Sequence, residues 1–224
     1  MPRLGGPGWR LATPAASHGG DSSPLLARLP ATPWRWNRPL AQGRLLFMSS
    51  LAPRWVTEEE FLALPESTNR VELLDGELIV APSPSYQHQV VLRRIVRALE
   101  DWAETQAGGV TLGMAPLDVR FAPGRILQPD AFVLFSETPR DHEGPIDRVP
   151  ALCVEVLSSN RAYDRLTKRL VYAEAGVSEL WTVSTDGQVE RWCGEHLAES
   201  ERLDKTLTSP LLPGFALDLT RLGA

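Results

Sequence analysis

The chain has 224 residues, of which 43% are hydrophobic and 23% are charged, and its net charge is −5. This length and balance predict one folded domain with a sizeable core. They exclude a fibrous protein, and because no apolar run approaches the roughly 18 residues of a membrane span, we expect no membrane association and a cytoplasmic location. Cys153 and Cys193 lack metal-ligand spacing and are predicted to be reduced thiols.

Residues 1–47 differ from the rest of the chain in composition. They contain six arginines and a single acid, Asp21, and many prolines and glycines without helical or strand periodicity. Such a segment cannot bury a core, so we predict that it is disordered. It also lacks the apolar core of a secretory signal. Our interpretation is that Met48 is the natural start, that residues 1–47 are an over-extended N-terminus, and that residues 48–224 form the functional domain.

The first patterned segments follow Met48. Thr57-Glu-Glu-Glu60 reads as a capping box that opens a short helix, which Pro65 ends. The pair Asp75-Gly76 between two apolar runs, 71–74 and 77–80, predicts a type I′ hairpin. Apolar residues at intervals of three and four predict an amphipathic helix over residues 88–103.

A β-rich block follows this helix. Apolar runs bounded by turn residues predict five strands, at residues 117–121, 126–135, 152–158, 178–183 and 188–192. Between the third and fourth strands, residues 164–175 predict a helix that ends at Gly176. This order of elements indicates one α/β domain with a mixed sheet.

Two acids stand in or beside apolar strands. Asp130 precedes the run AFVLF, and Glu155 lies inside ALCVEVL. Period-2 alternation places Glu155 on the face of Cys153, opposite Val156. A carboxylate buried in such a strand costs several kcal/mol unless it is paired. Magnesium or manganese, held by Asp130, Glu155 and the backbone carbonyl of Val156, would satisfy this requirement and supply the chemistry of phosphodiester hydrolysis.

A lysine follows these acids on the predicted helix. Lys168 is one of only two lysines in the chain, the other being Lys205, and every other cation is arginine. A compact ammonium suits a role beside an attacking water, where it would stabilise the charge that develops on the phosphate. The alternative is an ordinary helix salt bridge between Asp164 and Lys168, which stabilises a helix by a few tenths of a kcal/mol.

These residues fall within a pattern that resembles a known family. The stretches RVELLDGELIVAPSPSYQHQ, QPDAFVLF and ALCVEVLSSNRAYDRLTKRLVYAEAGVSELWTV resemble the Uma2 family of bacterial endonucleases, a branch of the PD-(D/E)XK nuclease superfamily. The resemblance covers roughly residues 53–220. It implies a restriction-endonuclease-like αβββαβ core with a mixed central sheet, preceded by an N-terminal helix and a β-hairpin.

The resemblance also implies roles for individual residues. Asp130 matches the PD aspartate and Glu155 the second acid of the superfamily. The superfamily lysine is expected two residues after the second acid, where this chain has Leu157. In Uma2-like sequences the lysine has moved to the next helix, which implies that Lys168 takes its place.

Two further positions match the family. Glu72 is an accessory carboxylate or a metal ligand, or else a solvated strand residue. His88 contacts phosphate or transfers a proton, or else is a structural residue at a helix start. Asp164 is an accessory residue that orients Lys168.

The leading hypothesis is a magnesium- or manganese-dependent endonuclease that cleaves DNA. Net charge is its weak point, because without the six arginines and one acid of residues 1–47 the chain carries −10, whereas DNA binding favours a basic surface. Two arginine groups could supply local positive charge, and a homodimer would assemble a better groove: Arg93, Arg94 and Arg97, and Arg161, Arg165 and Arg169. The alternatives are a binding or regulatory module with negligible turnover, and a hydrolase of another phosphate-bearing substrate.

Overall fold

A computed structural model describes residues 55–65, 70–157 and 162–223, without the side chains of residues 162–165. These residues belong to one compact unit that spans residues 50–224. The predicted disorder of residues 1–47 and the start at Met48 fall outside them. No helix in the described ranges is long and apolar enough to cross a bilayer.

The N-terminal predictions are confirmed. Helix α1 (Glu58–Leu62) begins with a reciprocal capping box between Thr57 and Glu60. Strands β1 (Arg70–Leu74) and β2 (Glu77–Ala81) form the hairpin, and its two turn residues both have positive φ, as a type I′ turn requires. Helix α2 spans Tyr86–Ala103 and begins at the N-cap Ser85.

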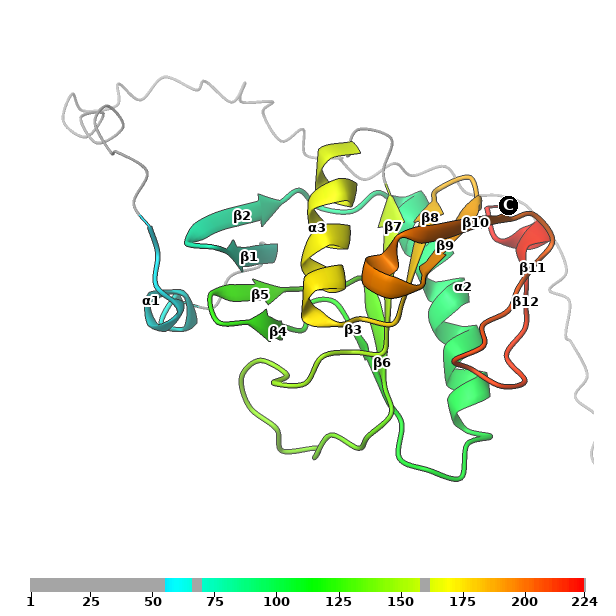
Figure 1. The fold of residues 1–224 in the computed structure, drawn as a ribbon, viewed down its shortest axis with the longest axis horizontal. Coiled ribbons are helices and arrows are strands. Elements are labelled where there is room, and N and C mark those ends of the chain that lie inside the picture. Colours follow the sequence, from blue (N-terminus) through cyan, green and yellow to red (C-terminus); the bar gives the residue numbers. More distant parts are fainter. Residues whose placement is uncertain (1–54, 66–69, 158–161, 224) are drawn as a thin grey trace, which may run out of the picture. The chain divides into compact units, whose positions relative to one another are not determined.

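The strands form two main sheets (Figure 1). A four-stranded antiparallel sheet has the order β2-β1-β5-β4, and a six-stranded sheet has the order β10-β9-β8-β7-β6-β3. In the larger sheet β7 and β8 are parallel and the other pairs are antiparallel, so the predicted mixed sheet is confirmed. The remaining strands are β3 (Thr111–Met114), β4 (Val119–Ala122), β5 (Arg125–Leu127), β6 (Ala131–Leu134), β7 (Leu152–Leu157), β8 (Glu179–Ser184), β9 (Val189–Cys193), β10 (Glu199–Leu203), β11 (Thr206–Leu207) and β12 (Leu217–Asp218).

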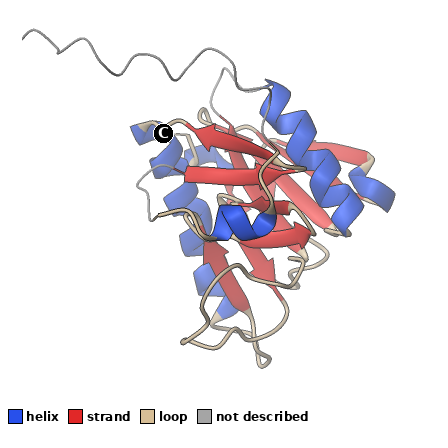
Figure 2. Cartoon of the chain, turned by 90° about the vertical axis from the view of Figure 1, so that its left-hand side faces the viewer, coloured by secondary structure: helices blue, strands red, loops and turns tan. Residues whose placement is uncertain are grey.

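Two long helices cover opposite faces of the six-stranded sheet (Figure 2). Helix α2 packs on the face that carries Val154 and Val156. Helix α3 (Ala162–Ala175) packs on the other face, where Tyr172 contacts the layer that contains Cys153. In chain order α2, β3, β6, β7, α3 and β8 form the expected αβββαβ core. Two short 3₁₀ helices, Glu195–Leu197 and Leu219–Arg221, follow β9 and β12.

The prediction of one continuous strand over residues 126–135 is wrong. The chain leaves the small sheet after β5 and joins the large sheet at β6, with Gln128-Pro129-Asp130 between them. Pro129 has no N–H to donate to a sheet. The backbone N–H of Gln128 donates to the Glu72 carboxylate, 2.9 Å away. Because this short segment belongs to neither sheet, the polar groups at both of its ends can contact side chains.

The first strand of the core is also not the predicted one. Residues 117–121 overlap β4, which belongs to the small sheet, and the core strand is β3, which the sequence pattern did not reveal. Four residues that include a glycine give too little alternation to be recognised.

Gly113 of β3 faces Phe132 across the strand pair. A Cβ at this position would lie 2.1 Å from the Phe132 ring, which is fully buried and cannot move aside. We expect Gly113→Ala to lower the free energy of unfolding by about 1–3 kcal/mol through overpacking, as measured by urea denaturation. The matched control is Gly108→Ala, where no atom lies within 4 Å; equal losses in the two variants would contradict the packing argument.

Candidate active site

Asp130 lies directly before β6, and Glu155 lies in the neighbouring strand β7. The pairs Ala131↔Val154 and Phe132↔Cys153 set an antiparallel register, and one further step along it places Asp130 opposite Glu155. Directly opposed residues have Cβ atoms about 5 Å apart and point to the same face. Asp130 is 2% exposed and Glu155 is 8% exposed. The strand register therefore brings two carboxyl groups together where little water reaches them.

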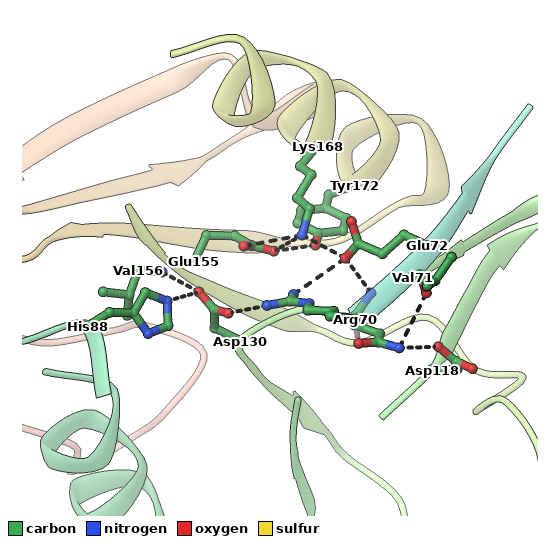
Figure 3. Close-up of polar contacts among 11 residues, drawn as sticks. Arg70, Val71, Glu72, His88, Asp118, Asp130, Glu155, Val156, Lys168 and Tyr172 are labelled. Carbon is green, nitrogen blue, oxygen red and sulfur yellow. Dashed lines mark hydrogen bonds and ion pairs between the residues drawn. The ribbon is translucent and has the colours of Figure 1, made fainter. Parts of the chain in front are cut away.

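Asp130 is surrounded by donors (Figure 3). Arg70 donates to its Oδ1 at 2.7 Å, and the backbone N–H of Val156 donates to its Oδ2 at 2.7 Å. Nε2 of His88, at the start of α2, lies 3.1 Å from the same Oδ2. Burial opposes ionisation, but the hydrogen bond from His88 and the charge of Arg70 outweigh it, so the pKa of Asp130 lies well below its usual range. Asp130 is therefore a carboxylate at neutral pH.

Glu155 has a different environment, formed by α3. Nζ of Lys168 lies 3.3 and 3.4 Å from its two oxygens, and the Tyr172 hydroxyl donates to Oε1 at 2.5 Å. Lys168 and Tyr172 reach the same carboxyl because residues four apart share one face of a helix. Burial raises the pKa of Glu155 to about 7, although Lys168 opposes the shift. Near neutral pH this carboxyl is therefore only partly ionised.

Glu72 links the small sheet to this cluster. Its Oε1 accepts from Lys168 at 2.9 Å, from the Gln128 backbone at 2.9 Å and from Arg70 at 3.4 Å. The side chain is 2% exposed, so the reading of Glu72 as a solvated strand residue is wrong. Lys168 thus contacts two acids from two different sheets. Burial lowers the pKa of Lys168, but the negative charges of Glu155 and Glu72 raise it by more, so the pKa lies above its usual value.

Three contributors were not recognised in the sequence. Arg70 and Glu72 are two residues apart on β1 and so share a face of the strand, a spacing that could have identified Arg70 as a neighbour of Glu72. Tyr172 stands four residues after Lys168. Gln128 donates its side-chain amide to Asp118 at 2.8 Å, and Asp118 is half-buried immediately before β4.

Residues 58–220 match the Uma2 family, described as "Putative restriction endonuclease". The chain belongs to the Uma2 family. The Uma2 domain is also similar to a solved structure from Anabaena variabilis, titled as a "putative nuclease belonging to DUF820". That likeness has 22% identity and a TM-score of 0.62, and it covers 75% of this chain and 97% of the other. No curated protein matches the chain.

Five of the predicted residues of the Uma2 domain come together in one cluster: Asp130, Glu155, Lys168, Glu72 and His88. Val156 joins them through its backbone N–H. The side chain of Asp164 lies outside the described residues, and so does its predicted pairing with Lys168.

A pocket of about 320 Å³ gives access to the cluster. Asp130, Arg70 and His88 line it together with the segment 82–85 before α2. The side chain of Arg70 is 20% exposed, compared with 3% for Asp130. Arg70 is therefore the group that a molecule entering the pocket would meet beside the buried carboxylate.

The residues present fit a hard divalent cation. Across the described side chains, no group of three or more His, Cys, Asp or Glu is arranged to hold a metal ion. Magnesium, however, needs only one or two carboxylates when water and substrate phosphate complete its shell. Arg70 binds Asp130 through a terminal nitrogen, while its buried Nε has no partner among the described residues. A cation at Asp130 would have to replace this contact from Arg70.

The pH dependence of stability provides a test of the Glu155 environment. Its pKa rises on folding from 4.5 to about 7, so the folded state binds the proton more tightly. The stabilisation is present below pH 4.5 and is lost as the pH rises through 7. In EDTA, we expect the free energy of unfolding of the wild type to fall more steeply between pH 5 and 7.5 than that of Glu155→Gln, as measured by urea denaturation. Parallel curves would show that Glu155 titrates normally.

Proposed function

We propose that the Uma2 domain is a magnesium- or manganese-dependent endonuclease that hydrolyses phosphodiester bonds in DNA. One observation carries the proposal: two buried carboxyl groups, Asp130 directly before β6 and Glu155 on the neighbouring β7, lie close enough for their charges to interact, with the ammonium of Lys168 beside Glu155. The family match and the fold of the solved structure support a nuclease function.

Asp130, Glu155 and the carbonyl of Val156 would hold the metal. When bound, it supplies Lewis-acid polarisation of the phosphate and makes water a better nucleophile. Glu155 is positioned for this by Tyr172, whose hydroxyl fixes one of its oxygens. Asp130 is positioned by the backbone N–H of Val156 and by His88.

Lys168 is the proposed catalytic cation. Its ammonium has three donors, and the cluster gives it acceptors on Glu72 and Glu155. These contacts hold the side chain in place, so that its charge need not reorganise when negative charge develops on a nearby phosphate. In the proposed reaction Lys168 orients the attacking water and stabilises the transition state.

A binding module without turnover remains the second candidate, because the cluster balances its charge internally. Arg70 and Lys168 offset Asp130 and Glu72, while Glu155 holds its proton up to about pH 7. Such a cluster is stable as a purely structural network. Metal binding separates the two candidates.

The carboxyl pair is tested by Asp130→Asn and Glu155→Gln, which preserve volume and most hydrogen bonds. Each variant should fold, as judged by circular dichroism, but lose manganese affinity in calorimetric titration and lose nicking of plasmid. Single-stranded DNA and RNA assayed in parallel define the substrate class. If either variant binds manganese and cleaves like the wild type, its residue does not belong to the metal site; if the wild type binds no metal, the module is the better reading.

Lys168→Ala is expected to bind metal but to cleave about a hundredfold more slowly under single-turnover conditions, because a positioned charge is lost from the transition state. Lys168→Arg should recover little of this rate, since a planar fork does not replace a compact ammonium. The other lysine provides the control: Lys205→Ala, an exposed residue between β10 and β11, should cleave normally. Cleavage by Lys168→Ala near the wild-type rate would assign Lys168 a structural role.

A further inference from the structure

One face of α2 carries a stripe of exposed side chains that the site does not use. Spacings of three and four residues place them in line along the helix: Tyr86, Gln89, Arg93 and Arg97. Tyr86 is 83% exposed, which is unusual for a large aromatic residue. Arg93 and Arg97 are exposed and have no hydrogen bond or ion pair with any described residue.

Two other arginines of the groups noted in the sequence, Arg94 and Arg169, are engaged with described residues, whereas Arg161 and the side chain of Arg165 lie outside the described residues. Arg94 donates to the backbone carbonyls of Arg221 and Leu222, near the C-terminus. Arg169 lies over the ring of Trp192, 4.3 Å from its centre, and donates to the Leu197 carbonyl. Arg93 and Arg97 therefore differ from Arg94 and Arg169 in making no such contact with a described residue.

This stripe forms one wall of a groove of about 950 Å³. The other wall is the edge strand β3, with Leu112 and Met114. Gln89 and Leu92 line both this groove and the pocket at Asp130. The groove and the pocket are thus adjacent at the start of α2, so a chain lying in the groove would end beside the candidate active site.

The charges along the groove limit what fits and where. Near the site the groove has Arg93 and Arg97, whereas its far end has Glu100, Asp101 and Glu104. A polyanion is attracted to the first part and repelled by the second. From Tyr86 to Arg97 the helix rises roughly 16 Å, which is the length of the favourable section.

We propose that this groove binds a single strand of nucleic acid and guides it to the active site. The inference rests on the proposed function and names the form of its substrate. Arg93 and Arg97 contact the phosphates, and Tyr86 stacks on a base at the entrance to the pocket. Stacking on an exposed ring requires an unpaired base face, and an aromatic residue beside cations is the usual combination in single-strand binding. Leu112 and Met114 offer an apolar wall to the bases.

The test measures binding without cleavage, by fluorescence anisotropy of a labelled oligothymidylate in EDTA. Arg93→Ala/Arg97→Ala should bind about 20-fold more weakly at 0.1 M salt and reduce the salt slope by about 1.4, since each phosphate contact on a single strand contributes about 0.7. Tyr86→Ala should lose roughly tenfold and Tyr86→Phe should retain affinity, because stacking needs only the ring. A duplex of the same length should depend little on Tyr86.

The matched control is Arg202→Ala/Lys205→Ala, which removes the same charge from exposed residues at and beyond β10, the opposite edge of the sheet. Equal affinities and salt slopes in the two double variants would overturn the proposal. So would a change in oligomeric state on sedimentation with binding unaltered, which would make the groove an interface between copies.

These outcomes are independent of catalysis. Groove-dependent binding by a wild type that never cleaves would support the groove and contradict the proposed nuclease function. Metal-dependent cleavage with binding insensitive to Arg93, Arg97 and Tyr86 would contradict the groove alone.

Discussion

Three acidic side chains are buried where little water reaches them, and the rest of the structure depends on keeping them paired. Asp130, Glu155 and Glu72 are each at most 8% exposed, and an ionised carboxyl in such surroundings is costly unless cations and donors surround it. Arg70 and Lys168 provide the cations. An unpaired buried charge is costly, and the paired groups lie on the small sheet, the large sheet and α3. The pairs therefore hold these three parts together as one unit.

The two carboxyl groups of the site are made unequal by their surroundings. Asp130 has an arginine, a histidine and a backbone N–H, and stays ionised, whereas Glu155 is buried deeply enough to retain a proton up to about pH 7. Such divergence between neighbouring acids is typical of functional sites. The proton on Glu155 limits the electrostatic repulsion between Glu155 and Asp130. Loss of this proton would leave a second negatively charged oxygen ligand for a metal beside Asp130.

Net charge is a poor guide to the surface of this domain. Beyond residues 1–47 the chain carries −10, yet at physiological ionic strength charges interact over only about 8 Å. Next to the site the wall of the groove presents Arg93 and Arg97, and its acids begin about one helical turn further along α2. A protein with a negative net charge can therefore bind an anionic substrate at a local basic surface. The acids further along α2 limit the length of that surface.

The sequence by itself determined the local features of this protein. The capping box at Thr57, the turn at Asp75-Gly76 and the long amphipathic helix follow from signals within a few residues, and the apolar runs around Asp130 and Glu155 identified two acids in unfavourable places. Only the tertiary structure decided that residues 126–135 divide between two sheets, that β3 enters the core, and that Arg70 and Tyr172 complete the cluster. Periodicity reports which face of an element is buried, but strand order and register arise from contacts between distant segments. Arg70 and Asp130 are 60 residues apart in the chain and meet only because β5 pairs with β1 before the chain crosses to β6.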